Sequence, residues 1–252
     1  MKIWRDLASW REARRTPALA GADLGFVPTM GALHAGHRAL LARARAENEH
    51  VVLSIFVNPA QFNDPADLAK YPRTLDADLA CALGLADHVI LPSAVECYPD
   101  NYRYRVTENA FSRELEGEQR PGHFDGVLTV VLKLLNLVQP RRAYFGEKDW
   151  QQLHLVEGMA RAFFMPVDIV PCATVRDPDG LALSSRNRRL SPAARRQAAE
   201  FPRILSAAPD AATAARDLAA AGLAVDYVVD RDGVRLGAVR IDDVRLIDNV
   251  RR

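Results

Sequence analysis

The sequence predicts an α/β protein with a Rossmann-like, doubly wound parallel sheet and a second, smaller α+β domain at the C-terminal end. Apolar runs such as residues 50–57 are rich in Val, Ile and Leu, as strands buried on both faces of a parallel sheet are. These runs alternate with segments of helical period, which favours strand–helix–strand units. The alternation stops near residue 175, so we expect one domain at 1–175 and a second, smaller domain at 176–252.

Each element of the larger domain follows from apolar periodicity and from Gly and Pro residues that interrupt it. We expect helices at 4–20, from 34–37 onward, over most of 67–85 with Thr74 as N-cap, and at 111–116, 127–138 and 150–163. We expect strands at 25–27, 50–57, 88–91, 102–106, 142–145 and 167–175. In the smaller domain, Ser191-Pro192 predicts a helix start, with helices at 193–201 and 211–221 and strands at 225–230 and 244–247.

Composition limits the possible partners of the chain. The 252 residues carry a net charge of +1, which gives no support for nucleic acid or a membrane as the main partner. Cys81, Cys97 and Cys172 are few and widely spaced, so neither a disulfide framework nor a zinc site is indicated and a reducing cytoplasm fits. No signal peptide is recognisable, and the most apolar run, 127–138, is too short to cross a bilayer.

The most informative stretch runs from Val27 to His37 and reads as a strand, a tight turn and a helix start. The first turn of a helix has unpaired N–H groups and partial positive charge, which suits a phosphate. His34 and His37 are three residues apart and would share a face of that helix. Each could instead be a surface or capping residue. A metal site is discounted because no Cys and no third His lies close by in the chain.

Two further loops follow predicted strands, and a third polar loop opens the smaller domain. Asn58 and Gln61 follow the strand at 50–57, on the edge where open parallel sheets bind ligands. Lys148 and Arg186 suit phosphate oxygens, although single basic residues are usually solvated surface charges. Asp149 could hold Mg²⁺ or a ribose hydroxyl, or cap the helix at 150–163, and Gln152 shares its helical face. Together the loops favour a nucleoside triphosphate.

These motifs resemble the His-x-Gly-His nucleotidyltransferases and, within them, the pantoate–beta-alanine ligase (pantothenate synthetase) family. The resemblance extends over nearly the whole chain, in order, through segments 28–37, 54–62, 71–74, 120–124, 145–152, 179–187 and 245–249. It implies ATP-dependent joining of (R)-pantoate and beta-alanine through pantoyl adenylate, with release of AMP and pyrophosphate. It also implies Mg²⁺ with the triphosphate, a homodimer and a cytoplasmic location.

The resemblance assigns roles residue by residue. His37, His34, Lys148 and Arg186 would be catalytic, with His37 as the acid or donor. Pantoate would contact Met30, Gln61 and Gln152. The nucleotide would be surrounded by Met30, Gly31, His34, Gly36, His37, Gly146, Glu147, Lys148, Asp149, Val175, Leu183, Ser184, Ser185 and Arg186.

Other interpretations stay open at this point. The helix N-terminus favours a neutral His37, whereas a bound triphosphate favours the charged form. Family members are expected to have a longer C-terminal unit than the one here, where 195–240 looks shortened. The chain could therefore be a binding protein that has lost turnover, or another nucleotidyltransferase that leaves AMP on its product.

Overall fold

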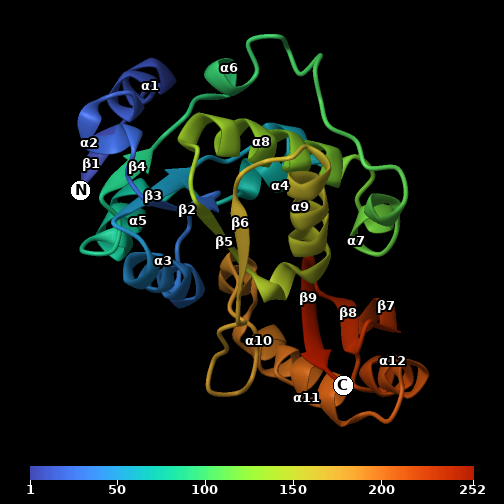
Figure 1. Ribbon diagram of the computed structural model, residues 1–252. Helices are drawn as coiled ribbons and strands as arrows, with labels where there is room; N and C mark the ends of the chain where they lie inside the picture. The colour runs from blue at the N-terminus through green and yellow to red at the C-terminus, as the bar shows by residue number, and fades with distance from the viewer. The chain divides into compact units, whose positions relative to one another are not determined.

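A six-stranded parallel sheet forms the centre of the larger part of the protein in the computed structural model, which describes residues 1–252 (Figure 1). The strand order is β1-β4-β3-β2-β5-β6, and every neighbouring pair is parallel. The strands are β1 (Lys2–Trp4), β2 (Leu24–Thr29), β3 (His50–Ile55), β4 (His88–Ile90), β5 (Arg142–Gly146) and β6 (Asp168–Cys172). The predicted Rossmann-like, doubly wound sheet is confirmed.

Helices cover both faces of this sheet because successive strand residues point to opposite sides. Phe26, Val52 and Phe145 pack with helices α1, α2, α8 and α9, whereas Val27, Leu53 and Tyr144 pack with α3 and α5. The α-helices of this part are α1 (Leu7–Arg14), α2 (Pro17–Ala20), α3 (Ala35–Glu47), α4 (Pro65–Lys70), α5 (Leu75–Ala82), α6 (Ala94–Cys97), α7 (Glu116–Gln119), α8 (His123–Val138) and α9 (Trp150–Ala162). Short 3-10 helices lie at η1 (Pro59–Gln61), η2 (Phe111–Arg113) and η3 (Glu147–Asp149).

The order of the strands places a topological switch point between β2 and β5. From β2 the chain proceeds outward through β3 to β4, and it later returns to β5 on the other side of β2. Open α/β sheets bind ligands beyond the carboxyl ends of the strands at such a point. The segments that follow β2, β3 and β5 are the ones expected to bind substrates, and these three strands are neighbours.

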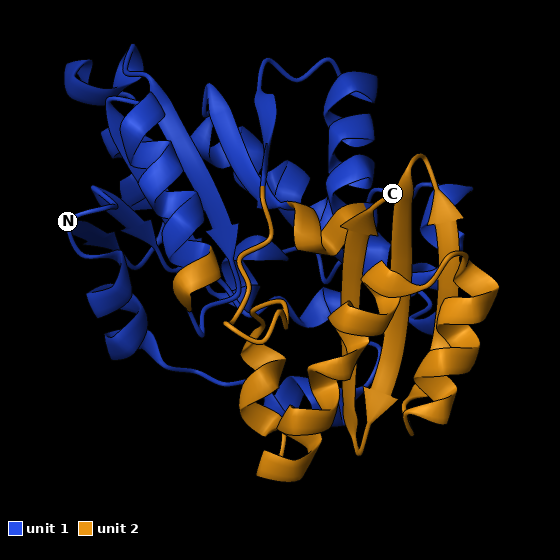
Figure 2. Cartoon of the chain, turned by 90° about the horizontal axis from the view of Figure 1, so that it is seen from below, with its two compact units in different colours: residues 1–33, 37–146, 151–172 blue, residues 34–36, 147–150, 173–252 orange.

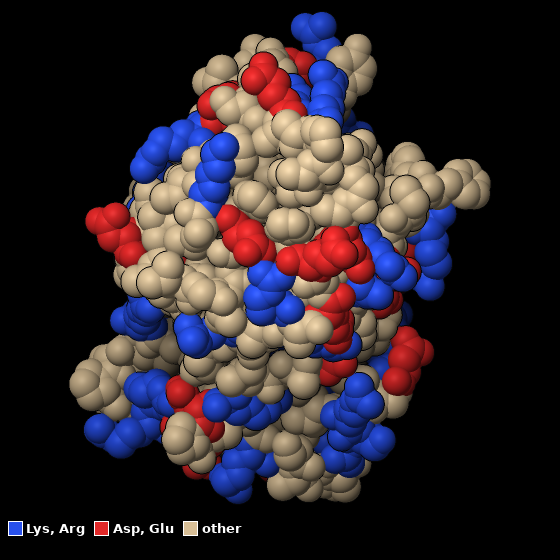
Figure 3. All heavy atoms as spheres, turned by 60° about the vertical axis from the view of Figure 1, so that its left-hand side comes forward, with Lys and Arg blue, Asp and Glu red and all other residues tan.

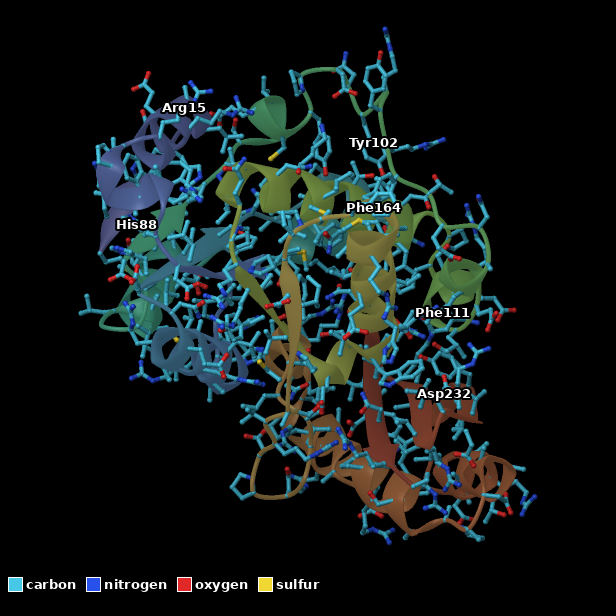
Figure 4. The ribbon with its side chains drawn as sticks, viewed as in Figure 1. Arg15, His88, Tyr102, Phe111, Phe164 and Asp232 are labelled. Carbon is cyan, nitrogen blue, oxygen red and sulfur yellow. The ribbon has the colours of Figure 1, made fainter.

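A three-stranded antiparallel sheet, β7-β8-β9, forms the second part together with helices at the C-terminal end of the chain. Its elements are η4 (Ser185–Arg189), α10 (Pro192–Ala198), α11 (Glu200–Ala207), α12 (Ala211–Ala220), β7 (Ala224–Arg231), β8 (Val234–Ile241) and β9 (Val244–Arg251). Asp232 and Gly233, both with positive φ, form the two-residue turn between β7 and β8 (Figure 4). The side chain of Arg235 on β8 is fully buried and donates to Asp230 and to the carbonyls of Leu205 and Ala208.

The chain divides into two compact units (Figure 2). Unit 1 comprises residues 1–33, 37–146 and 151–172, and unit 2 comprises 34–36, 147–150 and 173–252. Unit 2 therefore includes two short pieces that follow strands β2 and β5 as well as the C-terminal residues. The division into functional domains at 1–175 and 176–252 stays a prediction.

The surface carries charges of both signs, and no helix has the length and apolar character needed to traverse a lipid bilayer. On the face shown in Figure 3, basic and acidic side chains are interspersed, in line with the net charge of +1.

The structure differs from the predicted elements in several places. Residues 102–106 form no strand; they belong to an irregular connection that is tied to α8 through the Val106 N–H and Thr129 Oγ1. Strand β1, whose three residues pair with β4, was not predicted, and the helix predicted at 4–20 consists of two helices, α1 and α2. Strand β8 was not predicted at all, although Asp232-Gly233 is a hairpin signal.

Candidate active site

The turn after β2 is held in a strained shape by a buried carboxylate. Gly31 and Ala32 have φ values of +81° and +51°, a region that L side chains rarely adopt. Asp78 accepts from the N–H groups of Ala32 and Leu33 at 3.1 and 2.7 Å and from Thr74 Oγ1 at 3.2 Å. Asp78 is only 2% exposed. The carboxylate therefore fixes the backbone immediately before His34.

Asp78 was missed in the sequence, although a signal was present. Thr74 is the N-cap residue of α5, as predicted, but its hydroxyl binds Asp78 and caps no backbone N–H group. Leu75, Leu79 and Ala82 recur with helical period, and Asp78 falls on the same apolar stripe. A carboxylate at such a position needs hydrogen-bond donors, which predicts a structural or functional role.

His34 lies in unit 2, and its neighbour Gly36 sets the orientation of the imidazole. The Gly36 N–H donates to His34 Nδ1 at 3.2 Å, so the neutral ring carries its proton on Nε2. A Cβ atom at residue 36 would lie 2.9 Å from both Nδ1 and Cε1 of His34. Glycine is therefore required in the His-x-Gly-His string for close approach of this ring to the backbone.

Burial and nearby positive charge keep His34 neutral. Burial lowers its pKa most, the charges of Lys148 and Arg188 lower it further, and the resulting pKa is about 4. These residues all belong to unit 2. A neutral His34 with the proton on Nε2 is a hydrogen-bond donor at pH 7, and a bound triphosphate would favour protonation.

His37 lies in the first turn of α3, where the expected helix start is found. Its side chain is half-buried. The partial positive charge at the start of the helix favours an anion here. The structure thus gives His37 the local setting that sequence analysis expected.

The candidate pantoate residues of unit 1 lie partly together. Gln61 Nε2 is 3.1 Å from Met30 Sδ, so the segments after β2 and β3 meet. Asn58 is 1% exposed, and its Nδ2 donates to Gln61 Oε1 at 3.0 Å. Gln152, the third residue of α9, is half-buried and forms no hydrogen bond with Gln61 or Met30.

Lys148 is held through its backbone by the last strand of the chain. Asn249 Nδ2 on β9 donates to the carbonyls of Glu147 at 2.9 Å and Lys148 at 3.0 Å. The Lys148 side chain is 16% exposed, and its Nζ lies 3.6 Å from Asp149 Oδ1. Asn249 was part of the C-terminal motif, but its contact with this turn was not predicted.

The loop at 175–186 is organised by a short antiparallel pairing and by an arginine. The Leu183 N–H donates to the Val175 carbonyl at 2.9 Å, which brings these two candidate nucleotide residues together. Ser184 caps η4 by accepting from the Arg186 N–H at 3.2 Å. Arg176 donates to both carboxylate oxygens of Asp248 at 2.7 and 2.9 Å.

Most other candidate residues have the accessibility that a ligand requires. Gly146, at the end of β5, has open space where a Cβ would be. Half-buried side chains are found at Glu147, Asp149, Ser185 and Arg186. Within unit 2 the structure therefore groups His34 with Lys148, and Val175 with Leu183, while within unit 1 it groups Met30 with Gln61.

Comparison with known proteins assigns the chain to a family. A family model described as pantoate-beta-alanine ligase matches residues 2–251. The chain is 56% identical over 228 residues to the pantothenate synthetase of Bdellovibrio bacteriovorus, covering 90% of this chain and 91% of the relative. It is 50% identical over 252 residues to that of Legionella pneumophila, covering 99% of each. A C-terminal unit of this size thus also occurs in that relative.

Solved structures agree with the family model. A pantoate-beta-alanine ligase from Francisella tularensis, complexed with beta-gamma ATP and beta-alanine, has a TM-score of 0.95 and 38% identity, covering 100% of this chain and 97% of its own. The pantothenate synthetase of Thermus thermophilus has a TM-score of 0.90 and 41% identity, covering 100% of this chain and 99% of its own. The chain described here belongs to the pantoate-beta-alanine ligase family.

Proposed function

We propose that this protein joins (R)-pantoate to beta-alanine at the expense of ATP and forms pantothenate, AMP and pyrophosphate. The observation that carries the proposal is the match of the family model to residues 2–251. Relatives that share about half of their residues with this chain over nearly its full length are pantothenate synthetases. The Francisella ligase binds a nucleotide and beta-alanine, two of the ligands that the proposed reaction requires.

The proposed reaction has two steps. A pantoate carboxylate oxygen attacks the α-phosphorus of ATP, the bond to the bridging oxygen breaks, and pyrophosphate leaves. The amine of beta-alanine then attacks the acyl carbon of pantoyl adenylate, loses a proton, and AMP leaves with the electrons of the acyl–oxygen bond. Negative charge builds on the phosphoryl oxygens in the first step, so fixed donors there accelerate it.

We assign the two substrates of the first step, pantoate and ATP, to different residues of this chain. We assign pantoate to Met30, Gln61 and Gln152 in unit 1, where an amide offers both donor and acceptor to a hydroxy acid. We assign the triphosphate to His37 and, in unit 2, to His34, Lys148 and Arg186. The backbone around Gly31, Gly36, Gly146, Glu147, Asp149, Val175, Leu183, Ser184 and Ser185 is proposed to surround the nucleotide. Neutral His34 donates through Nε2, and Lys148 supplies positive charge.

Three further features belong to the proposal. The triphosphate is expected to enter as its Mg²⁺ complex, with Asp149, whose side chain is 47% exposed and lies 3.6 Å from Lys148 Nζ, as a candidate ligand. Residues 176–252 are proposed to act as a lid, and the active form is proposed to be a homodimer. The three free cysteines are compatible with a cytoplasmic location.

Isotope exchange tests the function directly. We expect the purified protein to exchange labelled pyrophosphate into ATP only when pantoate is present, and to release AMP only when beta-alanine is added. Exchange without pantoate would contradict the proposed substrate. Stable accumulation of an adenylated product in the presence of beta-alanine would instead indicate a nucleotidyltransferase that keeps AMP on its product. ATP binding without either reaction would indicate a binding protein.

A further inference from the structure

The amide of Gln61 lies in a buried hydrogen-bond network that determines which way it faces. Gln61 is 7% exposed, and its Oε1 accepts from Asn58 Nδ2 at 3.0 Å. Its Nε2 consequently lies on the side of Met30, 3.1 Å from the thioether sulfur. The opposite orientation would place Nε2 against Nδ2 of Asn58, with two donors facing each other. The orientation of Gln61 therefore depends on that of Asn58.

Asn58 is fully saturated and cannot turn over without losing its partners. Its Oδ1 accepts from the Ala60 N–H at 3.2 Å and from Tyr98 Oη at 2.6 Å. Its Nδ2 donates to Gln61 Oε1 and to the Gly126 carbonyl at 3.2 Å. A rotated Asn58 would face two oxygens with its own oxygen and leave buried groups unsatisfied, which costs about 1–3 kcal/mol per group.

Tyr98 is connected to Gln61 through Asn58, because its hydroxyl donates to Asn58 and Asn58 donates to Gln61. It follows α6, is 8% exposed, and packs its ring against Phe56 and edge-on against Tyr102 at 5.3 Å between centroids. Burial raises the pKa of its hydroxyl, so the group stays protonated and can donate at neutral pH. The Ala60 N–H and the Gly126 carbonyl determine which way the Asn58 amide faces, and the protonated phenol strengthens that orientation as a second donor at a shorter distance from Oδ1.

We propose that Tyr98 is a positioning residue for the hydroxy acid substrate: through Asn58 it holds Gln61 with the NH₂ group directed toward bound pantoate. The inference rests on the proposed function, which assigns pantoate to Gln61. A fixed NH₂ group donates to a carboxylate or hydroxyl oxygen, whereas the reversed amide would present its own oxygen to the acid. Tyr98 itself touches no reacting atom in this scheme.

Tyr98→Phe tests the proposal because it removes one oxygen atom and keeps the ring. We expect the KM for pantoate to rise about tenfold, which corresponds to the loss of one hydrogen bond, and the KM for ATP to change less than twofold. Tyr102→Phe is the matched control. Tyr102 lies on the connection after α6 (Figure 4), and its buried hydroxyl gives no hydrogen bond to Asn58 or Gln61. Its removal should leave both KM values unchanged.

The outcomes separate this inference from the proposed function. If the unmodified protein shows pantoate-dependent exchange and Tyr98→Phe does not alter the KM for pantoate, the positioning role is wrong and the function stands. An equal rise in both KM values also contradicts the role. If the unmodified protein shows no pantoate-dependent exchange, the proposed function itself fails.

A second variant decides the question if Tyr98→Phe does not fold. Asn58→Asp keeps the acceptor for Tyr98 and Ala60 but turns the donor that faces Gln61 and the Gly126 carbonyl into an acceptor. The Gln61 amide should then reverse to donate to the new carboxylate. We expect a rise of more than tenfold in the KM for pantoate, again with the KM for ATP nearly unchanged. An unchanged KM for pantoate would overturn the proposal.

Discussion

The surroundings of Gln61 in unit 1 and of Lys148 in unit 2 differ in the kind of interaction that fixes them. Gln61 is oriented by neutral amide and hydroxyl groups that are each more than nine-tenths buried. The turn at Lys148 is held by Asn249, whose neighbour Asp248 forms a bidentate ion pair with Arg176.

The two arrangements have different consequences. Neutral buried networks depend on correct donor and acceptor directions and respond little to salt. Ion pairs near the surface are weak individually and are screened by salt, and Arg176 is 29% exposed. The residues proposed to bind the nucleotide should therefore respond to the salt concentration, whereas those proposed to bind pantoate should depend on the directions of their donors and acceptors.

His37→Ala should have the largest effect, because His37 is the residue proposed to donate to the phosphoryl oxygens on which charge builds up in the first step. We expect the rate of pyrophosphate exchange to fall about 10²- to 10³-fold, as loss of one positioned transition-state donor does. Circular dichroism should show an unchanged fold. His50→Ala, at the first residue of β3, is the control and should retain the full rate. An unchanged rate in His37→Ala would remove this residue from the mechanism.

Gln61→Ala tests the unit 1 side of the comparison. Removal of the amide should weaken pantoate binding about 10- to 100-fold, since a hydrogen bond to a charged group is lost, and should affect ATP much less. Isothermal titration calorimetry with each substrate measures both. Asn63→Ala, two residues further on and exposed, should bind both as the unmodified protein does. A larger loss for ATP than for pantoate would reverse the assignment.

Asn249→Ala tests the unit 2 side. Loss of the two hydrogen bonds to the Glu147 and Lys148 carbonyls should raise the KM for ATP about five- to tenfold and leave the KM for pantoate unchanged. Arg240→Ala removes a half-exposed side chain from the same sheet and serves as control. Equal changes for both substrates would show that the two parts of the site are not independent.

The smallest expected effect concerns pH and His34. Its pKa in the folded protein, about 4, lies below the ordinary value of 6.5, so the unfolded chain binds more protons between these values. The stabilising contribution is complete above pH 6.5 and is lost as the pH falls toward 4. His34→Gln should therefore lose less stability than the unmodified protein between pH 7 and pH 4.5, measured by urea unfolding.

The unmodified protein and the variant are compared because burial also lowers the pKa of His88, which changes the stability of both proteins in the same direction as the pH falls. An identical pH dependence in the variant would show that His34 is not the neutral group described here. Addition of triphosphate should raise the pKa of His34, which the ring resonances would report in an NMR titration.

The sequence predicts the parallel sheet well because its strands are continuous apolar runs between helices of clear period. It predicts less where the backbone has no such pattern. Residues 102–106 alternate like a strand but have no neighbour to pair with, and β1 is too short for a pattern to appear in its three residues. Strand β8 contains Arg235, and a buried arginine obscures the apolar alternation on which strand prediction depends.

The candidate site also combines residues that the local sequence pattern indicates with residues that it does not. Residues that follow strands, such as Gln61 and Lys148, could be proposed from the sequence because the parallel topology determines where strand ends lie. Residues that orient them, such as Tyr98 and Asn249, lie 37 and 101 positions away in the sequence. Such contacts depend on tertiary packing, which local periodicity does not encode.

The buried carboxylate of Asp78 has one more consequence. Two adjacent backbone amides in a left-handed turn form a concave anion receptor, and Asp78 already fills the one at Ala32 and Leu33. A nucleotide cannot bind those amides while the Asp78 carboxylate occupies them. Truncation of Asp78 to alanine would vacate the receptor, so that chloride or inorganic phosphate gains a place to bind and the truncated enzyme becomes sensitive to the choice of buffer anion.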